Sequence, residues 1–184
     1  MPVTEETYKR LSLEDDEDKW ELVCGHLRRK PGMTHSHADV ATQLVVILAR
    51  QLDRRAFRVR ENNSRTRVQA GTYFIPDIAV VPYALTGPKL GSPDDELETY
   101  TQPLPFVAEI WSKSTADYDV TDKLPEYQRR ADLEIWFIHP YDRKATIWRR
   151  RPDGTYSRED FSSGVVSVAS LPNVHIDLAE LFDY

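Results

Sequence analysis

The sequence has one cysteine, no long apolar run and no Gly-x-Ser-x-Gly motif. With Cys24 alone there is no internal disulfide, and five scattered histidines without ligand spacing argue against a structural zinc site. No apolar run approaches the roughly 20 residues that cross a bilayer, so we expect no membrane partner. The acidic first residues lack the apolar core of a signal peptide, so we expect a cytoplasmic protein. A Gly-x-Ser-x-Gly pattern is missing, which excludes the usual serine hydrolase arrangement.

The composition is that of an ordinary globular chain. Its 184 residues are 40% hydrophobic and 29% charged, which predicts one domain over residues 1–184 with a real core. The formal net charge of −6 argues against a protein that coats nucleic acid without specificity. It is compatible with a nuclease, because carboxylates gathered around a divalent cation make a chain acidic and the bound metal reverses the local sign.

Basic residues nevertheless occur in local clusters. Such clusters could line a surface that follows phosphates, or they could be solvated surface. They are Arg28 to Lys30, Arg54 and Arg55, Arg58 and Arg60, Arg65 and Arg67, and Arg149 to Arg151.

Periodicity and turn residues predict the secondary structure of the first half of the chain. Thr4 is typical of a helix N-cap, and Gly25 is expected to turn a hairpin between residues 20–23 and 26–28. Apolar residues at three- and four-residue spacing predict a helix from Ser36 to about Arg54. Strands are expected at 57–60, 65–69 and 74–81, the last interrupted by Pro76 near its start or at an edge.

The second half begins with a polar stretch, 85–105, that we expect to form a mobile loop over the site. An apolar strand at 106–111 and a helix at about 120–130 follow. Further strands are expected at 134–138, 145–150 and 155–161, with a short helix at 179–182.

Two carboxylates interrupt apolar strands. Asp77 precedes Ile78 to Val81, and Glu109 lies within Phe106 to Trp111. A buried carboxylate is costly unless it is paired or binds a cation. Each could instead face solvent or meet an arginine, but two on neighbouring strands would suit Mg²⁺, which often uses only one or two protein carboxylates.

A row of polar residues follows Glu109. Asp119, Lys123 and Tyr127 are four residues apart and would share one face of a helix. An exposed row with one ion pair is the alternative interpretation. Pro125 fits the first turn of a helix better than its interior, so the helix could begin near Lys123.

At this point the chain resembles the Uma-type endonucleases, a branch of the restriction-endonuclease-like, or PD-(D/E)xK, superfamily. The resemblance spans nearly the whole chain, and the order and spacing of its motifs carry it. These motifs are Glu21 to Gly25, His35 to His37, Pro76 to Ile78, Glu109 to Thr115, the Asp119/Lys123/Tyr127 row, and Glu134 to Ile138. Cys24 departs from the pattern, because this position often holds Asp.

The resemblance implies an α/β (α+β) fold, restriction-endonuclease-like, with a central mixed β-sheet flanked by helices. It also implies a divalent metal, Mg²⁺ or Mn²⁺, held by Asp77, Glu109 and the backbone carbonyl of Ile110. The substrate would be nucleic acid, with DNA preferred. We further expect a homodimer, since a small domain that cuts both strands of a duplex benefits from a second copy.

The same resemblance assigns roles to other residues. Trp111 stands where the wider superfamily has its lysine, so Lys123 becomes the preferred candidate and Lys113 the rival, since Lys113 would share a strand face with Glu109. Glu21 would be an auxiliary acid, or else a solvent-facing hairpin residue. His37 would contact phosphate or carry a proton, or else be an ordinary polar residue.

These residues suggest a mechanism. A metal-bound water would attack phosphorus in line, Lys123 would position that water, and Ser112 could orient Glu109 or meet a phosphate. Two other classes remain open: a nuclease fold that binds nucleic acid or a protein without cutting, and an assembly domain that uses its aromatic residues as an interface.

Overall fold

The protein is described by a computed structural model over residues 2–15, 17–86, 96–112 and 118–183. Nine residues of the expected loop at 85–105 (87–95), together with Lys113, lie outside the described residues. The expected helix α1 runs from Glu5 to Glu14, and Thr4 caps it by accepting the N–H of Thr7. Within the described residues, no helix is long and apolar enough to span a membrane.

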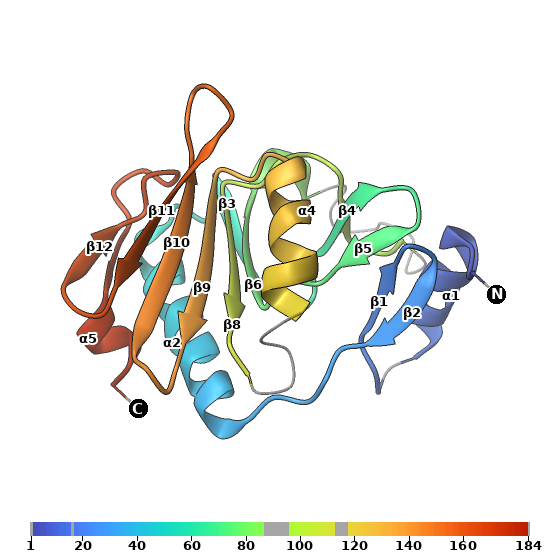
Figure 1. The fold of residues 1–184 in the computed structure, drawn as a ribbon, viewed down its shortest axis with the longest axis horizontal. Coiled ribbons are helices and arrows are strands. Elements are labelled where there is room, and N and C mark those ends of the chain that lie inside the picture. The colour runs from blue at the N-terminus through green and yellow to red at the C-terminus, as the bar shows by residue number, and fades with distance from the viewer. Residues whose placement is uncertain (1, 16, 87–95, 113–117, 184) are drawn as a thin grey trace.

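A six-stranded sheet forms the centre of the molecule, in the order β11-β10-β9-β8-β6-β3 (Figure 1). All neighbours are antiparallel except β8 and β9. Its strands are β3 (Phe57–Glu61), β6 (Ile78–Pro82), β8 (Phe106–Ile110), β9 (Glu134–His139), β10 (Lys144–Arg150) and β11 (Tyr156–Phe161).

A second sheet has five strands in the order β2-β1-β5-β4-β7. Its strands are β1 (Trp20–Val23), β2 (His26–Arg29), β4 (Arg65–Gln69), β5 (Thr72–Phe74) and β7 (Thr99–Tyr100). The hairpin expected around Gly25 is present, and Cys24 and Gly25 both adopt positive φ at its turn. A small third sheet pairs β12 (Val165–Ser167) with β13 (His175–Asp177) and was not expected from the sequence.

Helices cover both faces of the central sheet. The periodic segment forms α2 (His35–Gln51), whose Val40, Leu44 and Leu48 are fully buried against one face. The opposite face is covered by α4 (Leu124–Arg129), which follows a π-helical turn at Asp119–Lys123. Figure 1 shows α4 in front of the strands and α2 behind them. The chain ends with α5 (Leu178–Leu181), and a short 3-10 turn, Tyr83–Leu85, follows β6.

The single strand expected over 74–81 is wrong. The segment forms the end of β5 in one sheet and β6 in the other, separated by Ile75 to Asp77. Proline cannot donate a ladder hydrogen bond, so Pro76 suits the crossing between two sheets better than a strand interior. The crossing leaves Asp77 at the start of β6, where both sheets meet.

Candidate active site

Strand alternation directs the two carboxylates to the same side. Along β8, Phe106, Ala108 and Ile110 pack with α2, whereas Val107 packs with α4. Glu109 therefore points toward α4. In the antiparallel β6–β8 register Ile78 pairs with Ala108. Continuing this register by one residue puts Asp77 opposite Glu109.

Asp77 is 3% exposed, and both of its carboxylate oxygens have partners. Oδ1 lies 2.8 Å from the ammonium of Lys30. Oδ2 accepts the backbone N–H of Ile110 at 2.7 Å and lies 3.0 Å from Nε2 of His37. Burial alone would raise the pKa of Asp77, but the charge of Lys30 and the hydrogen bond from His37 hold it well below its usual range. Asp77 is therefore a carboxylate.

Glu109 is 2% exposed. Its Oε1 accepts a hydrogen bond from the ammonium of Lys123 at 3.1 Å and another from the hydroxyl of Tyr127. Burial raises the pKa of Glu109; Lys123 opposes this rise, and the nearby carboxylate of Asp77 adds to it. Because burial is the largest cause of this rise, an added cation beside Glu109 would favour its ionised form.

Lys123 joins the two sheets at the end of the π-helical turn. Its ammonium lies 3.1 Å from Glu109, 3.2 Å from Glu21 and 3.5 Å from Asp119. Burial would lower the pKa of Lys123, but these carboxylates raise it well above its usual value, so the side chain is charged. Single π-helical turns occur frequently at functional sites. Here the turn directs Asp119 and Lys123 into the site, and α4 directs Tyr127.

Glu21 on β1 is buried rather than solvent-facing. Oε1 accepts the N–H of Ile75 at 2.8 Å, and Oε2 accepts the hydroxyl of Tyr118 at 3.0 Å. The guanidinium of Arg28, on the paired strand β2, lies 3.1 Å from the centre of the Tyr118 ring. Glu21 is thus held in a fixed orientation beside Lys123.

His37 lies in the first turn of α2, and its N–H donates to the side chain of the N-cap, Thr34. Nε2 faces the Asp77 carboxylate, which favours a proton on that nitrogen. Nδ1 is buried and, in the described part of the chain, has no hydrogen-bond partner. The ring therefore retains one nitrogen that no described protein group uses.

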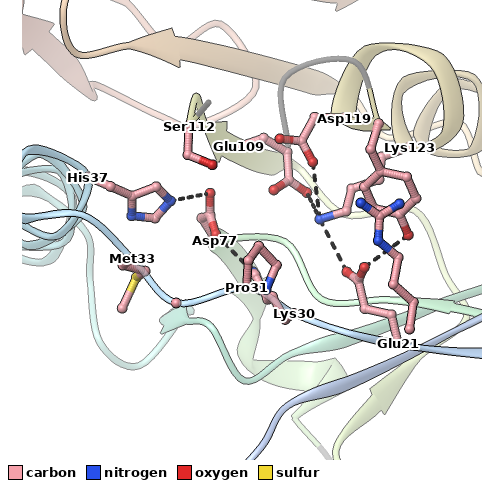
Figure 2. Close-up of a pocket in the computed structure, with 13 residues that line it drawn as sticks. Glu21, Lys30, Pro31, Met33, His37, Asp77, Glu109, Ser112, Asp119 and Lys123 are labelled. Carbon is pink, nitrogen blue, oxygen red and sulfur yellow. Dashed lines mark hydrogen bonds and ion pairs between the residues drawn. The ribbon is translucent and has the colours of Figure 1, made fainter. Parts of the chain in front are cut away.

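These residues line one pocket (Figure 2). All five expected catalytic residues line it. His37 contacts Asp77, and Lys123 contacts both Glu109 and Glu21. Ser112 lines it as well. The N–H of Ile110 donates to Asp77, so the Ile110 backbone, expected to supply a metal ligand, runs beside that carboxylate.

Sequence reasoning missed Lys30 as an individual site residue. Its ammonium bonds Asp77, the side-chain oxygen of Asn62 and the backbone oxygen of Ile75. Only its place in a basic cluster indicated any role. Arg60 and Arg67, expected as possible phosphate contacts, are instead paired with Glu98 and Glu5. Arg149 pairs with two carboxylates, on β9 and β11.

The donor set suits a hard divalent cation in kind, because Asp77 and Glu109 offer carboxylate oxygens and the raised pKa of Glu109 marks a place where positive charge is favourable. Among the described residues, however, no three His, Cys, Asp or Glu side chains are grouped to hold an ion. The ion would be coordinated by two carboxylates, a backbone oxygen and water, and Mg²⁺ is often bound by only one or two protein carboxylates.

The mixed α/β fold is shared with a solved structure. A crystal structure from Anabaena variabilis, described as a putative nuclease of the DUF820 family, matches the chain with a TM-score of 0.78 and 19% sequence identity, over 98% of each chain. At this identity the likeness shows the fold alone. The comparison with curated proteins found no match.

A match to a family model assigns this chain to a protein family. The model described as Uma2, "Putative restriction endonuclease", matches residues 5–179. The chain belongs to the Uma2 family, as the sequence motifs predicted. This membership supports a nuclease and, with it, a nucleic acid substrate.

Proposed function

We propose that this protein is a metal-dependent endonuclease that hydrolyses phosphodiester bonds, with DNA as its substrate. The observation that carries the proposal is that Asp77, just before β6, accepts the N–H of Ile110 next to Glu109, with the Lys123 ammonium 3.1 Å from Glu109. A carboxylate pair that can hold a divalent cation, with a charged lysine beside it, suits phosphodiester hydrolysis.

Asp77, Glu109 and the backbone carbonyl of Ile110 would hold Mg²⁺ or Mn²⁺. When bound, such a cation supplies an activated water and offsets negative charge at the phosphate. Lys30 and His37 fix the orientation of Asp77, and Tyr127 and Lys123 fix that of Glu109. Preorganised groups of this kind need no rearrangement during the reaction, which is why they lower its barrier.

The remaining side chains position substrate and protons. Lys123 is charged and offers its ammonium to the phosphate or the attacking water. Arg28 lines the pocket and would contact a phosphate oxygen. His37, with Nε2 on Asp77, would accept a proton at Nδ1, and only the ring protonated there would donate to a phosphate oxygen. Glu21 acts as the auxiliary acid by fixing Lys123 from the second sheet.

The test is a cleavage assay on plasmid and single-stranded DNA with Mg²⁺ or Mn²⁺. Asp77→Asn and Glu109→Gln keep the shapes of the side chains and remove their charges, and each should abolish cutting. The matched control is Asp160→Asn on β11, an exposed carboxylate outside the pocket, which should cut like the wild type. Cutting by both site variants at the wild-type rate would contradict the proposal.

One observation favours a second candidate, a nuclease fold that binds nucleic acid or a protein without cutting. Both oxygens of Asp77 already have protein partners. Binding of nucleic acid with no metal-dependent cleavage would select this candidate. We further propose one domain over 1–184, a homodimer and a cytoplasmic location, for which mass measurement in solution and cell fractionation are the tests.

A further inference from the structure

Three aromatic rings lie together where β8 and β9 end. The N–H of Trp111 donates to the Ile138 oxygen at 2.7 Å, so Trp111 continues the strand pairing past β8. His139 is the last residue of β9, and Tyr141 follows it. The rings of Trp111 and His139 contact each other at a tilt of 32°, with centroids 4.2 Å apart, and Tyr141 meets Trp111 edge to face at 5.7 Å. We call these three rings the aromatic cluster.

The aromatic cluster adjoins the candidate active site from two sides. Trp111 stands between Ile110, whose N–H bonds Asp77, and Ser112, which lines the pocket. The hydroxyl of Tyr141 lies 3.4 Å from that of Thr34, the N-cap of the helix that carries His37. Figure 1 shows the ends of β8 and β9 beside the start of α2.

One ring of the aromatic cluster is held in orientation by a hydrogen bond, and another is exposed to solvent. Nδ1 of His139 accepts the N–H of Asp142 at 3.0 Å, which sets the orientation of its ring. Tyr141 is 55% exposed, and Met33, which lines the pocket, is 50% exposed. An exposed aromatic ring beside a polar pocket is available to stack against a flat ligand.

We propose that the aromatic cluster stacks a nucleobase of the same nucleic acid whose phosphodiester enters the pocket. This inference rests on the proposed function and adds the substrate class. Every base has a π-face that can stack on an aromatic side chain. A base inside a duplex is already stacked on its neighbours, so the substrate is single-stranded or locally unpaired nucleic acid.

A nucleotide fits the pocket and the aromatic cluster together. The pocket is lined by the cations Arg28, Lys30 and Lys123 and by four carboxylates, so a phosphate would enter together with the divalent cation of the proposed function. A ligand that reaches both the pocket and the aromatic cluster must combine an anionic group with a flat ring next to it. A nucleic acid strand has this combination in every residue.

The experiment measures binding of two single-stranded oligonucleotides in Mg²⁺ by fluorescence anisotropy. Both carry phosphorothioate linkages that resist cleavage, and one of them is abasic. Tyr141→Ala should weaken binding of the base-containing strand by about 5- to 100-fold and leave the abasic strand unchanged. Tyr141→Phe should bind like the wild type. Tyr83→Ala is the matched control, because Tyr83 is 37% exposed but follows the far end of β6 from Asp77.

The outcomes separate the two proposals. If Tyr141→Ala binds the base-containing strand as tightly as the wild type does, the stacking role is overturned and the nuclease proposal stands. The same holds if Tyr141→Ala instead disrupts self-association, which would assign the aromatic cluster to an interface between copies. If the wild type binds neither oligonucleotide, the stacking proposal fails, and cleavage of plasmid DNA decides the nuclease proposal separately.

Discussion

Replacing Lys30 with methionine tests how the site holds Asp77 in place. The Lys30 ammonium has three donors, and they meet Asp77 at 2.8 Å, the Asn62 side chain at 2.7 Å and the Ile75 oxygen at 2.7 Å. Methionine keeps most of the side-chain length and removes all three hydrogen bonds. Asp77, with its side chain only 5% exposed, would then lose its nearest permanent cation.

The expected loss of stability in Lys30→Met follows from the burial of the Lys30–Asp77 ion pair. Removing one partner of a buried ion pair costs about 3–5 kcal/mol, because the remaining charge stays desolvated. Urea unfolding of the metal-free protein should therefore show a free energy of unfolding lower by about 3–5 kcal/mol in Lys30→Met. Mg²⁺ should stabilise this variant more than the wild type, since a cation at Asp77 would replace part of the lost charge.

Arg29→Met is the matched control. Arg29 is the neighbouring basic residue, but its side chain is 66% exposed and pairs with Asp18 at the surface. Exposed pairs of this kind contribute about 0–1 kcal/mol. If Lys30→Met were as stable as Arg29→Met, Lys30 would not hold Asp77 in the way described.

Two further perturbations have defined outcomes. Tyr127→Phe removes the hydroxyl that donates to Glu109 and should lower the free energy of unfolding by about 1–2 kcal/mol in thermal denaturation. Tyr141→Phe, which removes an exposed hydroxyl, is the control and should change the free energy of unfolding little. Equal effects of the two substitutions would argue against the Glu109 contact. Glu5→Gln tests a pH dependence: partial burial raises the pKa of Glu5, but hydrogen bonds from Arg67, Tyr73 and the Gly71 N–H lower it more, from 4.5 to about 2. Because the pKa is lower in the folded state, the ionised Glu5 stabilises the fold above about pH 4.5, and this stabilisation is lost as pH falls toward 2. Urea midpoints of wild type and Glu5→Gln should therefore converge on acidification, and a constant difference would contradict the assignment.

The sequence predicted the elements whose signal is local. The spacing of Val40, Leu44 and Leu48 defined α2 within a few residues, and Gly25 marked the hairpin. Asp77 and Glu109 were found because carboxylates in apolar strands are costly, which makes them conspicuous without any contact information.

Long-range contacts could not be predicted in the same way. Lys30, beside Pro31 and Gly32, has the sequence surroundings of a surface loop. Its partners Asn62 and Ile75 lie 32 and 45 residues away, so only tertiary packing shows that it is a site residue. The division of 74–81 between two sheets also depends on which strand each half pairs with, and that information is not local.

The most direct measurement of the central claim is a calorimetric titration of Mn²⁺ into the wild type and into the Asp77→Asn/Glu109→Gln double variant. We expect binding by the wild type and none by the double variant, with both proteins folded by circular dichroism. Equal binding by both proteins, or no binding by the wild type, would contradict the assignment of these two carboxylates as the metal ligands.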